Sequence, residues 1–196
     1  MKCIKKDCNK TVQHFVISKD AAINPQTCEI GNLRELFGYF QYKAPNTSSY
    51  QCTNLDSSYH ANAYREMTKS WKNENFGIIP SNAPFGERSR QYALDGESIC
   101  SYCKRFACKR KQSRNGTRET DFDCLVRHIR NSLAHGRVFV IHGGNSIKIL
   151  FEDYDPRRKV ITSRIVCNQS DLKKWRTIIN QYLKIQRETN VTSNIN

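Results

Sequence analysis

The chain has 196 residues, of which 32 are lysine or arginine and 18 are acidic, giving a formal net charge of +14. This length suits one domain with a buried core. The positive excess favours a polyanionic partner, above all a nucleic acid, over the alternative of a basic protein that is merely soluble. The first twenty residues lack the apolar run of a signal peptide and no stretch is long enough to span a bilayer, which predicts a cytoplasmic protein without membrane contact. Nine cysteines, an odd number without an export signal, predict reduced thiols.

Two helices are expected in the first part of the chain, after an N-terminal segment (residues 1–23) whose pattern fits either a short strand or a helical turn. The first helix should begin at Asn24-Pro25, because proline suits the first helical position, and it should end before Pro45. The second should be capped within residues 56–58. Its apolar residues recur every four positions and are expected in the core: Leu55, Tyr59, Ala63, Met67 and Trp71.

A loop over residues 75–90 and a third helix are expected next. The loop is rich in proline and glycine. The helix should begin near Arg88 or Glu97, because four apolar residues follow at helical spacing: Ile99, Tyr102, Cys103 and Phe106. A basic run without acidic residues then leads towards residue 118. It includes Lys109, Arg110, Lys111 and Arg114, and it is either a solvated surface or a contact for a phosphate backbone.

The helix expected at about 121–135 is the best defined element of the chain. Thr120 suits its N-cap, and Gly136 suits a left-handed C-terminal cap. At about 100° per residue, one side is an apolar stripe that belongs in the core: Phe122, Leu125, Val126, Ile129 and Leu133. The opposite side is polar and basic. It carries Arg127, Arg130, Asn131, Ala134 and His135, with Arg130 and His135 about 140° apart.

After residue 136 the spacing of apolar residues changes from helical to alternating, and near the C-terminus it becomes helical again. Three β-branched, alternating stretches separated by turns predict an antiparallel meander over about 137–167. A last helix is expected at about 170–187, with a polar tail at 189–196. From the residues themselves, the fold class is therefore mainly α with a three-stranded antiparallel β-meander before the last helix.

The segment Arg130-Asn-Ser-Leu-Ala-His135 resembles the R-N-x-x-x-H signature of the HEPN (higher eukaryotes and prokaryotes nucleotide-binding) superfamily. Its setting, at the end of an amphipathic helix followed by glycine and a strand-like run, is similar to that in HEPN proteins of phage-defence and toxin systems. The resemblance extends from about Asn24 to Leu183. It implies a HEPN-like helical bundle over residues 24–188 and a homodimer paired through the motif helices. It further implies metal-independent RNA cleavage, as in many members.

These residue types suit RNA cleavage by the 2′-hydroxyl group of the RNA itself. The imidazole of His135 can move protons near neutral pH, and the guanidinium of Arg130 can bind two phosphate oxygens. The acid and the base require two imidazoles, which the dimer implied by the resemblance would supply. Asn131 would orient the histidine or the phosphate, with Arg127 and His128 as further candidates. The expected RNA contacts are Arg127, Lys109, Arg110, Lys111, Arg114 and Arg137.

This interpretation predicts a metal-independent endoribonuclease without cofactors, acting as a toxin or abortive-infection effector and restrained by an antitoxin or other regulatory protein. One alternative is purely structural: Arg130 would pair with an acid, and His135 would cap carbonyl groups. Another is a non-catalytic, dimerising HEPN-like module that binds RNA or nucleotide. Arg137 stands where some toxin members carry a regulatory tyrosine, which puts that mode of regulation in doubt.

The cysteines allow a separate hypothesis of a zinc site. Three thiols are closely spaced in sequence, with Cys124 or Cys3 as a fourth ligand: Cys100, Cys103 and Cys108. No second C-x-x-C pair accompanies them, so small buried thiols are the favoured interpretation and no metal is expected.

Overall fold

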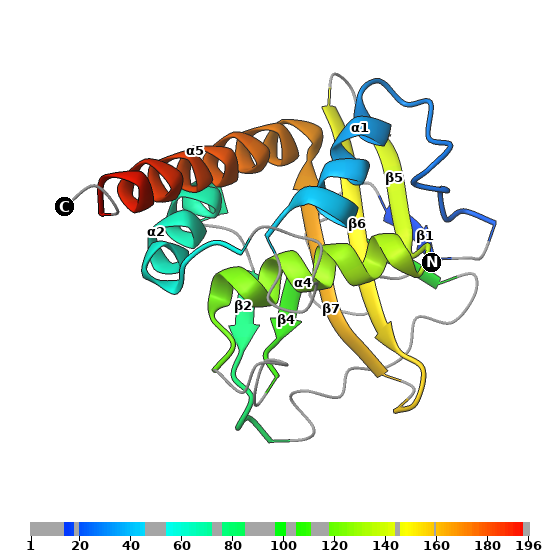
Figure 1. The fold of residues 1–196 in the computed structure, drawn as a ribbon. Coiled ribbons are helices and arrows are strands. Elements are labelled where there is room, and N and C mark those ends of the chain that lie inside the picture. The colour runs from blue at the N-terminus through cyan, green and yellow to red at the C-terminus, as the bar shows by residue number, and fades with distance from the viewer. Residues whose placement is uncertain are drawn as a thin grey trace.

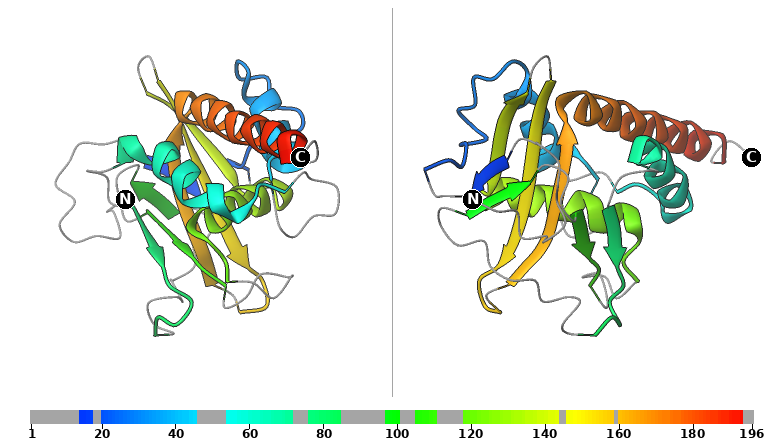
Figure 2. Two further views of the ribbon diagram at one scale, coloured as in Figure 1. Left: turned by 60° about the vertical axis from the view of Figure 1, so that its left-hand side comes forward. Right: turned by 180° about the vertical axis from the view of Figure 1, so that it is seen from behind.

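The computed structural model describes residues 14–17, 20–45, 54–71, 76–84, 97–100, 105–110, 118–143, 146–158 and 160–193. In chain order the elements are β1 (His14–Ile17), α1 (Leu33–Gly38), the π-helical turn η1 (Tyr39–Lys43), α2 (Ser57–Met67), the 3-10 turn η2 (Lys69–Trp71), β2 (Phe76–Ile79), β3 (Glu97–Cys100), β4 (Arg105–Cys108), α4 (Asp121–Ala134), β5 (Val138–Gly143), β6 (Ser146–Asp155), β7 (Val160–Asn168) and α5 (Gln169–Ser193). A mixed sheet carries α1 and α4 on one face and the small β1–β3 sheet on the other (Figures 1 and 2).

The main sheet has five strands in the order β2-β4-β7-β6-β5. The neighbours β5, β6, β7 and β4 pair antiparallel, whereas β2 pairs parallel with β4. Successive residues point to opposite faces of a strand, so the two faces carry different apolar ladders. Val138, Phe151 and Ile165 belong to the main core beneath the helices. The opposite face packs on β1 through a second cluster made of Phe15, Ile17, Phe139, Leu150 and Val166.

Helix α4 lies across this sheet and also contacts α2 and η1 on its other side (Figure 1). Its N-cap is Thr120, whose side-chain oxygen accepts a hydrogen bond from the backbone N–H of Asp123 at 3.1 Å. It ends at Ala134, and two residues later Gly136 has a φ of +64°, in the left-handed region that favours glycine. Both predicted ends of this helix are therefore confirmed, as is the burial of its apolar stripe.

The expectation of a mainly α, HEPN-like helical bundle with an appended three-stranded meander is wrong. Strands β5 to β7 are part of a five-stranded mixed sheet, because β4 adds to β7 and β2 adds to β4. Strand β2 lies within the predicted loop of residues 75–90, and β3 and β4 lie where the third helix was expected. The apolar spacing there fits a helix equally well, but main-chain pairing of Phe106 and Ala107 with β7 selects the extended form.

The other helices differ from their predicted bounds mainly at the ends. Helix α2 has the expected cap, since the Asp56 carboxylate accepts a hydrogen bond from Ser58 N at 2.8 Å. Helix α1 begins at Leu33 and not at Pro25, because Asn24 Oδ1 accepts from Gln26 N and folds this segment into a turn. Helix α5 continues to Ser193, past the expected end at residue 187. None of the described helices has the length and apolar character that crossing a membrane requires.

Trp175 on α5 joins the helices to one another. Its indole Nε1 donates a hydrogen bond to the carbonyl oxygen of Met67 at 2.7 Å, and its ring packs edge-on against Phe40 and Trp71. The side chain is completely buried. The contacts place α5, α2 and η1 around one aromatic centre beside the sheet.

We expect Trp175→Ala to lower the free energy of unfolding by about 3–5 kcal/mol, because it leaves a large cavity and removes the partner of the Met67 carbonyl. Urea denaturation monitored by circular dichroism measures the change. The matched control is Lys174→Ala on the adjacent, exposed position, which should change stability by less than about 0.5 kcal/mol. Equal effects of the two substitutions would contradict this role of Trp175.

Candidate functional site

The structure divides the polar residues of α4 by depth. Arg127 and His128 are buried, with exposed fractions of 6% and 0%. Arg130 and Asn131 are partly buried, whereas His135 is exposed at the C-cap, where its backbone N–H donates to Asn131 O at 2.9 Å. Much of the side expected to be polar and accessible therefore faces the sheet. Of Arg130, Asn131 and His135, only His135 is exposed.

Arg127 is enclosed in a buried ion pair. Its Nε lies 2.5 Å from Glu119 Oε1, and its Nη2 donates to Glu119 Oε2 at 3.0 Å and to the carbonyl oxygen of Cys108 at 2.9 Å. Burial lowers the pKa of Arg127, but the hydrogen bonds and charge of Glu119 outweigh burial and raise it, so the guanidinium stays charged. The pair ties α4 to the end of β4. In this conformation Arg127, expected to contact RNA, has its donors directed into the protein.

Asp153 on β6 holds the next turn of the helix. Its Oδ2 lies 2.7 Å from Nδ1 of His128 and accepts a hydrogen bond from Nδ2 of Asn131 at 2.9 Å. The second ring nitrogen of His128 lies 2.9 Å from the carbonyl oxygen of Cys108. Burial raises the pKa of Asp153, but the hydrogen bonds from His128 and Asn131 outweigh it and hold the pKa below its ordinary value. The amide of the motif residue Asn131 is thus anchored to the sheet.

A similar arrangement joins α2 to the start of α4. His60 Nδ1 lies 2.9 Å from Thr120 Oγ1 and 3.4 Å from Asp123 Oδ2, and Nε2 lies 2.9 Å from the carbonyl oxygen of Leu55. Burial lowers the pKa of His60, but Asp123 outweighs it, so the pKa lies above its ordinary value. No role was assigned to His60 from the sequence. Its position next to Tyr59 of the apolar stripe of α2 is the one sequence feature that points to burial and so to a partner.

Arg130 and His135 occupy different positions around the end of α4. The Nη2 of Arg130 donates to the carbonyl oxygen of Ala44 at 2.6 Å, at the point where η1 ends. His135 lies five residues later, which displaces it by about 7.5 Å along the helix axis and about 140° around it. The arginine side chain therefore borders η1, whereas His135 lies further along, at the exposed C-cap. One copy of the chain presents the two groups on different sides.

The expected RNA contacts do not gather around this end of the helix. Lys109 forms an ion pair with Asp121, at the opposite end of α4, and Arg110 is exposed beside it. Along the axis of α4, this basic region lies about 14 Å from Arg130 and about 21 Å from His135. Arg137 forms an ion pair with Glu152 and packs over the ring of Tyr154. The remaining two, Lys111 and Arg114, lie outside the described residues.

The zinc hypothesis falls partly on residues outside the described ones, namely Cys3, Cys103 and the side chain of Cys100. Cys108 and Cys124 are buried thiols, and burial raises the pKa of Cys124 well above its ordinary value. A buried thiol with a raised pKa is a poor metal ligand, because metals bind the thiolate. Among the side chains that the structure describes, no group of three His, Cys, Asp or Glu residues is arranged to hold a metal ion.

We expect Asp153→Asn to destabilise the protein by about 3–5 kcal/mol at neutral pH, because it breaks a buried, hydrogen-bonded charge network. The carboxylate has a lowered pKa, so its contribution is present above the unfolded value of about 3.9 and is lost as pH falls through the folded value. The stability difference between the two proteins should therefore shrink below about pH 4.

Thermal unfolding from pH 7 to pH 3 measures this difference. The control is Asp155→Asn, two residues along β6 at a partly exposed position, which should cost less than about 1 kcal/mol. A stability difference for Asp153→Asn that does not change with pH would contradict the assignment.

Comparison with known proteins gives the family. Neither a curated protein nor a solved structure matches the chain. The family profile described as HEPN pEK499 p136 matches residues 55–191, well over half of the chain and the whole of α4. HEPN domains commonly dimerise and bind RNA or nucleotides, and many are ribonucleases. The chain therefore belongs to the HEPN pEK499 p136 family of the HEPN superfamily.

Proposed function

We propose that this protein is a metal-independent RNA endonuclease whose active site forms where the C-terminal ends of two α4 helices meet. The observation that carries the proposal is the exposure of His135 at the end of a helix whose rotation is fixed by buried charges. A catalytic imidazole must reach its substrate yet be held in place, and this position meets both requirements. Membership of the HEPN family supports the same reaction.

The reaction uses the 2′-hydroxyl group of the RNA as nucleophile. One His135 imidazole accepts the 2′-hydroxyl proton while the 2′-oxygen bonds to the adjacent phosphorus. The bond from phosphorus to the 5′-oxygen breaks, and a second imidazole donates a proton to the leaving oxygen. The guanidinium of Arg130 stabilises the charge on the phosphorane oxygens. The products are a 2′,3′-cyclic phosphate and a 5′-hydroxyl.

Two copies supply the second imidazole. His60 and His128 are buried and held by carboxylates, so neither can exchange a proton with a substrate. His142 is exposed, but it lies near the far end of β5, more than about 10 Å from the start of that strand. A two-fold axis beside the end of α4 would bring a second His135 into the site. The same axis would place the Arg130 of one copy closer to the His135 of the other.

Other predicted residues take supporting roles in the proposal. Asn131 acts as a positioning residue through its hydrogen bond to Asp153. The basic residues beyond the N-terminal end of α4 would contact phosphates several nucleotides from the cut, since α4 is about 20 Å long. As a toxin or abortive-infection effector in the cytoplasm, such an enzyme would need an antitoxin or other regulatory protein to restrain it.

A non-catalytic RNA- or nucleotide-binding module is the second candidate, and one observation favours it. The guanidinium of Arg130 donates to the carbonyl of Ala44, and Arg127 and Arg137 are paired with Glu119 and Glu152. A site whose arginines are engaged within the chain can support dimerisation without turnover. Measurement of cleavage separates the two functions.

We expect the purified protein to cleave single-stranded RNA in excess EDTA, to leave 2′,3′-cyclic phosphate ends, and to spare DNA of the same sequence. His135→Ala should reduce the rate by about 10²-fold or more, because it removes a general acid or base. Arg130→Ala should reduce it by about 10²-fold through lost stabilisation of the transition state, with a smaller effect on RNA binding. Gel electrophoresis of end-labelled RNA measures each rate.

The matched control is His142→Ala, which removes the other exposed described histidine and should retain the wild-type rate. A 2′-O-methyl group at the cleaved nucleotide should abolish cutting there. Cleavage that requires Mg²⁺, attacks DNA equally or persists in both motif variants would rule out the mechanism. Intact RNA binding without any cleavage would favour the non-catalytic module.

We also expect a homodimer in solution, with a mass twice that of the protomer by light scattering. Ala134→Glu should convert it to the protomer and abolish cleavage, because Ala134 is exposed beside His135 and a charge there would face its own copy across the two-fold axis. Ala61→Glu introduces the same change at an exposed position of α2 and should leave the dimer intact. A fully active monomer would contradict a composite site.

A further inference from the structure

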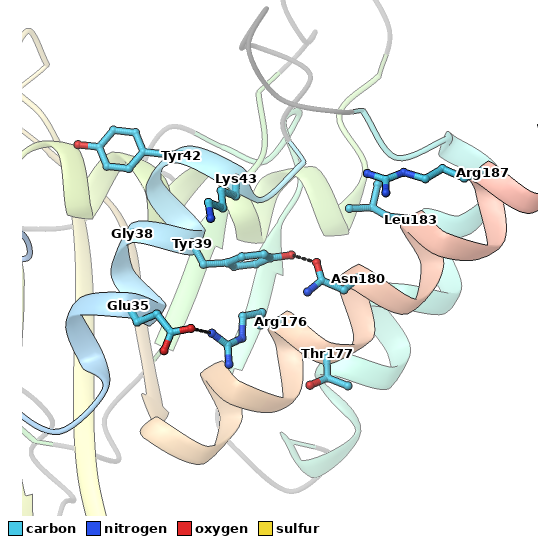
Figure 3. Close-up of a pocket in the computed structure, with 10 residues that line it drawn as sticks. All are labelled: Glu35, Gly38, Tyr39, Tyr42, Lys43, Arg176, Thr177, Asn180, Leu183 and Arg187. Carbon is cyan, nitrogen blue, oxygen red and sulfur yellow. Dashed lines mark hydrogen bonds and ion pairs between the residues drawn. The ribbon is translucent and has the colours of Figure 1, made fainter.

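We propose that the groove between η1 and α5 binds a single-stranded segment of RNA on one side of the motif (Figure 3). The proposal deepens the proposed function, because it rests on RNA as the substrate and names where a flanking part of the strand lies. The groove encloses about 930 Å³ and is open to solvent. This volume lies within the range of protein ligand sites and suits one or a few nucleotides.

Two contacts hold the walls of the groove in place. The hydroxyl of Tyr39 on η1 donates to Oδ1 of Asn180 on α5 at 2.9 Å. Arg176 on α5 lies 2.5 Å from Oε1 of Glu35 on α1. Both are drawn as dashed lines in Figure 3, and they tie η1 and α1 to positions of α5 that are four residues, about one helical turn, apart. The groove is therefore formed before any ligand binds, which lowers the entropic cost of binding.

The charges in the groove favour an anionic strand. Its lining holds three cationic side chains and one acid, and that acid, Glu35, is already paired with Arg176. Within the described part of the chain, Lys43 and Arg187 form no ion pair or hydrogen bond. They approach the groove from η1 and from α5 respectively (Figure 3). Two such cations on opposite walls suit successive phosphates of a backbone.

The exposed ring of Tyr42 lies on η1 at the margin of the groove and projects away from α5 (Figure 3). Tyr42 is 58% exposed, although most tyrosines of a folded domain bury more of the ring. Its neighbours include the amide of Gln26, which donates to the Tyr42 hydroxyl at 3.3 Å. A ring held in this way beside free cations suits stacking of an unpaired base, which is the usual means by which proteins bind single strands. Duplex RNA does not expose its base faces, so the groove selects single-stranded segments.

The groove adjoins the proposed catalytic arginine. Lys43 is followed directly by Ala44, whose carbonyl oxygen accepts the hydrogen bond from Arg130. Consecutive Cα atoms are about 3.8 Å apart, so the backbone of the groove wall is in contact with the motif guanidinium. A strand with its scissile phosphate at Arg130 can continue past Lys43 and Tyr42 into the groove. The π-helical turn η1 is a rare backbone form often found at functional sites, which agrees with this placement.

Binding of 2′-fluoro single-stranded RNA tests the inference without cleavage, because this RNA lacks the nucleophile. The variant Lys43→Glu with Arg187→Glu should weaken binding at least tenfold at 150 mM salt, measured by fluorescence anisotropy. It should also reduce the slope of log affinity against log salt by about 1.4, the value for two lost phosphate contacts. Tyr42→Ala should weaken binding about fivefold or more, and Tyr42→Phe should retain it.

The matched control is Lys173→Glu with Lys174→Glu, an equal change of charge on exposed positions of α5 outside the groove. It should weaken binding less than threefold. Equal losses in the two double variants, or unchanged binding of Tyr42→Ala, would overturn the inference. Conversion of a dimer to protomers by the groove variants would also overturn it, since a second copy would then occupy the groove.

The outcomes separate this inference from the proposed function. If the wild-type protein does not cleave RNA but the groove variants lose RNA binding as expected, the groove assignment stands and the nuclease proposal fails. If the wild-type protein cleaves RNA and the groove variants bind and cleave as it does, the nuclease proposal stands and the groove assignment fails.

Discussion

The structure depends on the pairing of charges between α4 and the elements around it. A buried guanidinium or carboxylate without a partner costs several kcal/mol, so each polar group on the sheet-facing side of α4 must have one. Glu119 forms an ion pair with Arg127, and the Asp153 carboxylate lies within hydrogen-bond distance of His128 and Asn131. Because these contacts lie on one side of the helix, they fix its rotation about its own axis. That rotation decides where the motif side chains Arg130 and His135 point.

The same constraint gives the two ends of α4 different properties. At the N-terminal end, the Asp123 carboxylate pairs with His60 and the Asp121 carboxylate pairs with Lys109. These two acids of the first turn therefore have partners within the protomer. At the C-terminal end, the helix stops at a left-handed glycine and His135 is exposed. A helix anchored firmly at one end and open at the other suits a composite site, because the open end can meet a second copy without unfolding the first.

Features that depend on residues close together in the sequence were predicted correctly. Features that depend on contacts between residues far apart in the sequence were not. The Thr120 cap, the Gly136 stop and the apolar stripe of α4 are local, and they are confirmed. Strands β3 and β4 were assigned as helix because pairing with β1 and β7 cannot be seen in a spacing pattern. The sheet-facing position of Arg127 and Asn131 was also missed, since Glu119 and Asp153 lie outside the helix whose wheel was drawn. The catalytic assignment of Arg130, Asn131 and His135 stays a prediction.

The net charge of +14 gives a poor measure of the surface available to RNA. Among the described residues, five arginines are engaged by acids of the same protomer: Arg127, Arg137, Arg158, Arg164 and Arg176. Such pairs were already formed in the absence of nucleic acid, so their cations release few counterions when a phosphate approaches. Polyanion binding must then come from cations without an internal acid. In the described part of the chain, Lys43 and Arg187 meet this condition on facing walls of one groove, one residue from the carbonyl that holds Arg130. If RNA is the ligand, as we propose, the distribution of unpaired charge would matter more than its total for where a strand can lie.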